Sequence, residues 1–128
     1  MDSELIIEKA KEARKKAYAP YSNFLVGAAV LTKSGRIFTG CNIENVAYGL
    51  TICAEACAIA KTVSEGYKDI KTIALVADTE DIPFPCGSCR QIILEFGDDI
   101  KIIMANLSGD RLEKIITELL PLGFTKIK

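Results

Sequence analysis

The sequence contains no histidine among its 128 residues. This absence excludes Ser-His-Asp and Cys-His catalysis, and it excludes zinc sites built from histidine. A metal ion in this protein would therefore be held by cysteine or carboxylate side chains. The sequence also lacks any apolar run approaching the roughly 20 residues that span a bilayer. Its charged first residues, M-D-S-E-L-I-I-E-K, show no signal-peptide pattern. We therefore expect a cytoplasmic protein with no membrane partner.

Strong charge of either sign is missing as well, because the formal net charge is -1. A broad basic surface supplies most non-specific affinity for nucleic acid, so we expect no nucleic-acid partner. The five cysteines are an odd number and do not resemble a secreted disulfide framework. Packing or metal ligation is the expected role of these thiols.

Hydrophobic periodicity predicts one domain over residues 1–128. Helices are expected over 3–18, 51–65, 85–97 and 108–121, with Thr51 and Ser108 as N-caps. Strands are expected as a hairpin over 24–41 and as single strands over 71–78 and 100–106. This alternation predicts an α/β fold, a three-layer α/β/α sandwich whose mixed central sheet combines the antiparallel hairpin with parallel strands.

One buried-looking segment, T-I-C-A-E-A-C-A-I-A over residues 51–60, carries Glu55 between Cys53 and Cys57. A carboxylate in such a run is unfavourable unless something requires it. Downstream, P-C-G-S-C opens another predicted helix with Cys86 and Cys89. Two helix N-termini stabilise thiolate charge, so the three cysteines Cys53, Cys86 and Cys89 could hold Zn²⁺ and leave its fourth position open. Glu55 would then be the acid–base group beside a catalytic metal.

The pattern C-A-E followed by P-C-x-x-C resembles the zinc-dependent nucleobase deaminases. Three longer stretches, Y-S-N-F-L-V-G-A-A-V, G-R-I-F-T-G-C-N-I-E-N and P-C-G-S-C-R-Q, are similar to the small homotetrameric cytidine deaminases. The resemblance implies hydrolytic deamination of cytidine and deoxycytidine, with Cys53, Cys86 and Cys89 on zinc and Glu55 as proton shuttle.

The same resemblance implies the substrate contacts. The Ala54 backbone N–H would hold the pyrimidine carbonyl, Asn42 and Glu44 would bind the ribose hydroxyls, and Phe24 would pack against the base. It further implies a homotetramer whose neighbouring subunits complete each pocket, with Tyr48 and Phe124 as candidates for that role.

One position departs from the family pattern, which usually has Arg directly after the glutamate, where this chain has Ala56. That Arg hydrogen-bonds zinc-bound thiolates and withdraws negative charge. Our hypothesis is that the zinc-bound water is less acidic here, with Arg90 or the Cys57 thiol as alternative donors.

Other interpretations stay open on the sequence alone. Cys53 and Cys57 are spaced as i and i+4, so with Cys86 and Cys89 they could form a closed Cys₄ structural zinc site. Deamination of a cytosine-bearing antibiotic such as blasticidin S, or of a base in nucleic acid, would use the same motifs. The ribose-type motif C-N-I-E-N speaks against the antibiotic, and the balanced charge speaks against nucleic acid.

Overall fold

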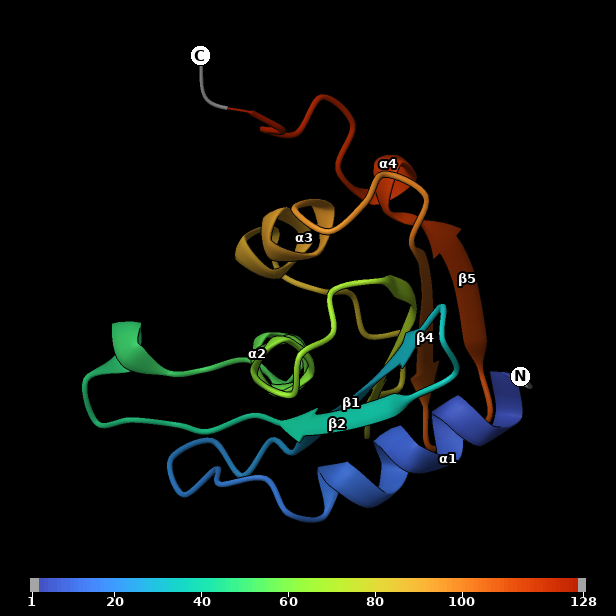
Figure 1. Ribbon diagram of the computed structural model, residues 1–128. Helices are drawn as coiled ribbons and strands as arrows, with labels where there is room; N and C mark the ends of the chain where they lie inside the picture. Colours follow the sequence, from blue (N-terminus) through green and yellow to red (C-terminus); the bar gives the residue numbers. More distant parts are fainter. Residues whose placement is uncertain (1–2, 127–128) are drawn as a thin grey trace.

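A five-stranded mixed sheet forms the middle layer of the computed structural model, which describes residues 3–126 (Figure 1). The strands lie in the order β2-β1-β3-β4-β5. Their bounds are β1 Val26–Thr32, β2 Ile37–Cys41, β3 Ile70–Ala77, β4 Lys101–Asn106 and β5 Arg111–Ile115. The neighbours β3 and β4 run parallel, and the other pairs of neighbouring strands run antiparallel. The predicted mixed sheet is confirmed.

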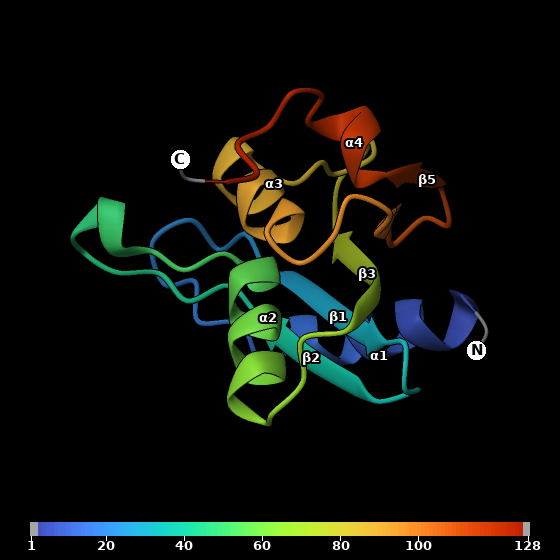
Figure 2. The same ribbon diagram turned by 45° about the horizontal axis from the view of Figure 1, so that its top comes forward.

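Helices cover both faces of this sheet, which confirms the three-layer sandwich (Figure 2). On one face, α1 (Ser3–Arg14) packs Ile6, Ile7 and Ala10 against alternate residues of β1, β3 and β4. On the other face lie α2 (Ala54–Ser64), α3 (Gly87–Leu94) and the short α4 (Ile116–Leu119). Because both faces of the sheet are covered, its central strands are apolar almost throughout, as buried strands are.

Two glycines let helices approach the sheet at backbone distance. A Cβ at Gly40 in β2 would lie 2.3 Å from the Ala58 nitrogen of α2. A Cβ at Gly27 in β1 would lie 2.0 Å from the Ala10 oxygen of α1. No side chain fits at either contact, so α1 and α2 pack directly against the hairpin backbone from opposite faces of the sheet.

The last predicted helix is wrong over most of its length, because residues 111–115 form β5, antiparallel to β4. The Asn106 side chain holds the connecting turn: its Oδ1 accepts from the Ser108 and Asp110 nitrogens at 3.1 and 2.9 Å. Gly109 takes a φ of +99° within this turn. Ser108 therefore lies in a hairpin turn, not at a helix N-cap.

Other boundaries also differ from the predictions, among them those of the third helix, which is Gly87–Leu94 instead of 85–97. The first helix ends at Arg14 instead of 18. The third residue of the T-I-C stretch, Cys53, is the N-cap of α2, while the hydroxyl of Thr51 accepts from the Asn45 nitrogen at 3.2 Å. This later start leaves Cys53 and Glu55 together at the first turn.

The chain segments that build the site meet at one edge of the sheet, the edge formed by the ends of the strands. Val26 at the start of β1 pairs with Ala77 at the end of β3, and Gly27 pairs with Cys41 at the end of β2. Since β1 is antiparallel to both neighbours, its beginning and their ends meet at the same edge. The helices α2 and α3 begin beside that edge (Figure 2).

Candidate active site at two helix N-termini

Two of the predicted metal ligands are N-cap residues of different helices. Cys53 precedes α2 and Cys86 precedes α3, and both have extended backbone conformations. The Cys86 sulfur also accepts from the Cys89 backbone N–H at 3.4 Å. The unpaired N–H groups and positive dipole ends of both helices therefore face the sulfur atoms, which favours thiolates.

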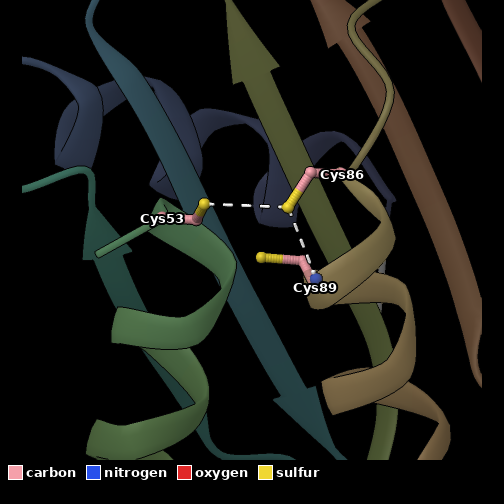
Figure 3. Close-up of side chains that lie close together, drawn as sticks. All are labelled: Cys53, Cys86 and Cys89. Carbon is pink, nitrogen blue, oxygen red and sulfur yellow. Dashed lines mark hydrogen bonds between the residues drawn. The ribbon is translucent and has the colours of Figure 1, made fainter. Parts of the chain in front are cut away.

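The three predicted cysteines converge (Figure 3). Their sulfur atoms all lie within 4.8 Å of one another, and the Cys53 and Cys86 sulfurs are 3.9 Å apart. A tetrahedral zinc ion with Zn–S bonds of about 2.3 Å separates two thiolates by about 3.8 Å. The cluster therefore fits zinc, with three protein ligands and room for a fourth, exchangeable one.

The thiols do not share charge equally in the metal-free protein. Hydrogen bonding from Cys89 is the main cause that lowers the pKa of Cys53 to about 6. The same interaction, together with burial, raises the pKa of Cys89. Cys89 is 1% exposed and Cys86 is exposed, so the cluster runs from the protein interior to the surface.

Glu55 lies at the first turn of α2 with only 5% of its surface exposed. Burial is the main cause that raises the pKa of Glu55 to about 7. A carboxyl group that titrates near neutral pH can both accept and return a proton, which is the property required of a general acid–base group.

A cavity of about 220 Å³ opens over these residues. Phe24, Asn42 and Ala54 line it together with Cys53, Glu55 and Cys86, so six of the predicted site residues meet there. The sequence did not predict the remaining lining residues, which are Val26, Thr51, Leu75, Ala77, Pro83 and Phe84. Phe84 is an exposed aromatic two residues before the first cysteine of P-C-G-S-C, and that position beside a ligand motif is the signal that could have identified it.

Glu44 is buried and is not among the residues that line the cavity. Its Oε1 accepts from the Tyr21 and Ser22 backbone nitrogens at 3.0 and 3.1 Å, and its Oε2 accepts from the Ser22 hydroxyl. These bonds, chiefly that of the Ser22 hydroxyl, lower the pKa of Glu44. In the isolated chain this carboxylate thus holds the segment that carries Phe24.

Tyr48 and Phe124 lie away from the cavity of their own chain. Tyr48 is 82% exposed in the 3₁₀ turn Tyr48–Leu50, and Phe124 is 66% exposed. The backbone of Phe124 is bound to the Gln91 side-chain amide, which donates to its oxygen at 2.6 Å and accepts from its nitrogen at 3.1 Å. Their predicted role in a neighbour's pocket stays a prediction.

The closed Cys₄ interpretation is not supported, because Cys57 lies outside the three-sulfur group. Burial, and to a smaller extent the charge of Cys57, raise the pKa of Cys41. Arg90, suggested above as an alternative donor to the thiolates, makes its hydrogen bonds elsewhere. Its guanidinium donates to the Pro85 and Leu119 carbonyl oxygens at 2.8 and 2.7 Å. It ties the ligand loop to the end of α4.

Within residues 3–126, none of the helices has the length and apolar character needed to cross a bilayer.

Comparisons with known proteins agree with this site. Residues 1–105 match the family described as the cytidine and deoxycytidylate deaminase zinc-binding region. The chain is 50% identical over 127 residues to a cytidine deaminase of Sporosarcina psychrophila, covering 98% of this chain and 93% of that one. It is 38% identical over 109 residues to a blasticidin-S deaminase of Bacillus cereus, covering 79% and 77%.

A solved structure has the same fold. The cytidine deaminase of Burkholderia pseudomallei superposes with a TM-score of 0.94 at 44% identity, covering 97% of this chain and all of that one. The match to the family spans most of the chain and contains Glu55 and all three cysteines of the candidate metal site. This chain therefore belongs to the cytidine and deoxycytidylate deaminase family.

Proposed function

We propose that the protein hydrolyses cytidine and deoxycytidine to uridine and deoxyuridine with release of ammonia. The observation that carries this proposal is the buried Glu55 carboxyl, which shares one small cavity with two thiol ligands of a three-cysteine metal site. Zinc at such a site supplies activation of a water molecule as the nucleophile. The Sporosarcina psychrophila cytidine deaminase also covers 98% of this chain at 50% identity, against 79% at 38% for the blasticidin-S deaminase.

Glu55 performs the proton transfers of this reaction. It accepts a proton from the attacking water and delivers it to N3 of the pyrimidine, while the water oxygen bonds to C4. Glu55 then carries a second proton from that oxygen to the amine, which leaves as ammonia when the C4 carbonyl forms. A pKa of about 7 suits both directions of transfer near neutral pH.

The rest of the cavity would orient the base. The Ala54 N–H is the first of α2 and has no acceptor within the helix, so it is available for the pyrimidine carbonyl. Phe24 supplies an apolar wall, and Asn42, which also lines the cavity, would bind a ribose hydroxyl. Glu44 does not line the cavity and would have to exchange its bonds to the Tyr21–Ser22 segment for a bond to the ribose. Excluding water around the base strengthens each of these polar contacts.

We further propose a homotetramer in which Tyr48 and Phe124 enter a neighbour's pocket. The arm between β2 and α2 supports this assembly, because it exposes Val46, Tyr48 and Leu50 at 82%, 82% and 66% (Figure 1). A cytoplasmic location is proposed with it, since the cysteine ligands are free thiols and require a reducing environment.

The test is ultraviolet-monitored deamination of cytidine, deoxycytidine, cytosine and blasticidin S by zinc-loaded protein, with Glu55→Gln beside the wild type. We expect turnover of both nucleosides, and a loss by a factor of about 10²–10⁴ in Glu55→Gln, which is the usual contribution of a general acid–base group. Metal content measured on both proteins shows that the variant still binds zinc. Turnover of blasticidin S alone would assign the antibiotic instead, and no turnover by the fully loaded wild type would refute the proposal.

A further inference from the structure

The wall of the cavity that carries Phe24 is an exposed loop, residues 20–24, between α1 and β1. Tyr21, Ser22, Asn23 and Phe24 are all exposed, and the Phe24 side chain is 44% exposed. Apolar packing therefore restrains this loop little, and its conformation depends on hydrogen bonds. Asn23 adopts a φ of 59°, a left-handed conformation that asparagine tolerates better than most residues.

One hydroxyl group stands at the centre of those hydrogen bonds. The Ser22 Oγ donates to Oε2 of Glu44, and it accepts from the Phe24 backbone N–H at 3.0 Å. Its proton can point to only one acceptor, and the carboxylate fixes that choice. The lone pairs are then turned to the Phe24 amide, so Glu44 orients Ser22 and Ser22 holds Phe24.

Asn42 secures the other side of Phe24. Its Nδ2 donates to the Phe24 carbonyl at 2.8 Å, and its Oδ1 accepts from the Val26 nitrogen at 2.9 Å. The two peptide groups that flank the Phe24 side chain are thus each held by a polar side chain. Asn42 holds the Phe24 carbonyl and Ser22 holds the Phe24 N–H, while Glu44 in turn bonds the Ser22 hydroxyl. Asn42 and Glu44 both come from the single stretch C-N-I-E-N.

We propose that Ser22 is a positioning residue for substrate binding, which transmits the placement of Glu44 to the aromatic wall formed by Phe24. This inference rests on the proposed function, since it assigns the base to that wall. The hydroxyl has no contact with the cysteine ligands or Glu55, so its removal should loosen substrate binding and leave the proton transfers intact.

Removing the Ser22 hydroxyl is expected to change KM and to leave kcat nearly unchanged. A hydrogen bond to a charged group contributes enough to change an equilibrium by about tenfold or more. Ser22→Ala should therefore raise KM for cytidine about tenfold and change kcat less than twofold, with zinc content unchanged. Ser22→Thr keeps the hydroxyl and should restore most of the affinity. Ser64→Ala, which removes a hydroxyl at the far end of α2, is the matched control and should change neither constant.

A double-mutant cycle shows through which residue Ser22 acts. If the hydroxyl acts through Phe24, Ser22→Ala should raise KM less than twofold in a Phe24→Ala background. A full tenfold effect in that background would overturn the proposed route. Where Ser22→Ala does not yield folded, zinc-loaded protein, Ser22→Cys keeps a weaker donor of similar shape and should give an intermediate KM.

The results that would overturn the role of Ser22 differ from those that would overturn the proposed function. A wild type that turns over cytidine, with Ser22→Ala equal to it in KM, would overturn this inference alone. Equal changes in kcat and KM, or a Ser22→Thr variant that does not recover affinity, would also overturn this inference alone. A zinc-loaded wild type without turnover would overturn the proposed function and this inference with it.

Discussion

Replacing the buried acid–base group should make the metal-free protein more stable while it abolishes activity. Glu55 has a pKa of about 7 in the folded chain against 4.5 for an ordinary glutamate, and burial is the main cause. One pKa unit corresponds to about 1.4 kcal/mol, so ionising Glu55 in the fold costs on the order of 3 kcal/mol. Glu55→Gln removes this cost because the amide stays neutral at every pH.

The sign of the pH dependence follows from the raised pKa. Between pH 4.5 and 7 the folded chain binds the Glu55 proton more tightly than the unfolded chain does, so the free energy of unfolding falls as pH rises through this window. Below pH 4.5 wild type and Glu55→Gln should be nearly equal. By pH 8 the variant should be more stable by on the order of 3 kcal/mol.

Urea unfolding of chelator-treated wild type and Glu55→Gln, measured from pH 4 to 8, tests this expectation. Glu44→Gln is a control for which the opposite change in stability is expected, because the Ser22 hydroxyl lowers the pKa of Glu44. That variant should be less stable than wild type at neutral pH, and the difference should vanish as pH falls through the acidic range. Parallel curves for wild type and Glu55→Gln across pH 4.5–7 would refute the reasoning.

Three further outcomes are expected. Gly40→Ala should lose about 3 kcal/mol or more in urea unfolding, because its Cβ meets the α2 backbone, while Gly49→Ala, whose Cβ meets nothing within 4 Å, should change stability by less than about 0.5 kcal/mol. Ala56→Arg should move the acidic limb of the kcat/KM profile to lower pH, because a guanidinium beside three thiolates favours loss of a proton; an unchanged limb in zinc-loaded protein contradicts this. Gln91→Leu removes both bonds to Phe124 and should accelerate amide exchange at Phe124 at least tenfold with zinc content unchanged; equal exchange rates count against it.

Residue spacing is sufficient to predict the three-cysteine cluster and the central elements. The ligands Cys53 and Cys86 lie at helix starts, where local signals such as proline and the change from loop to periodic apolar residues are strong. The i, i+3, i+4 pattern of Cys89 with Ile92 and Ile93 predicts an inward-facing thiol, and Cys89 is buried. Local sequence thus places each thiol at a helix start, and the sheet topology brings the sulfurs together because both helices begin at one sheet edge.

The chain after β4 could not be assigned by the same reasoning. Leu112, Ile115 and Ile116 are spaced as on a helix face, yet pairing with β4 makes the first two part of a strand. The S-G-D turn fixed by Asn106 is the available signal for a hairpin. The edge strand Arg111–Ile115 is short and has three charged side chains among its five residues, so its apolar pattern is weak and pairing with β4 decides its structure.

The sequence alone also does not predict the side-chain hydrogen bonds around Phe24. The stretch C-N-I-E-N indicates polar residues near the site, but not that Glu44 turns toward Ser22, 22 residues earlier in the chain. Such a contact depends on how the loop after α1 folds over the arm after β2. Spacing within a motif carries no information on it.

A zinc ion held by the two N-cap cysteines would also act as a cross-link between distant parts of the chain. Joining Cys53 to Cys86 closes a loop spanning 33 positions, which includes all of α2 and β3. In the chain-entropy model a link across a loop of that length stabilises a fold by on the order of 3–4 kcal/mol. The link ties together only elements on the α2–α3 side of the sheet and the strand beneath them. Loss of metal should therefore loosen that layer first, while α1 keeps its hold on the opposite face.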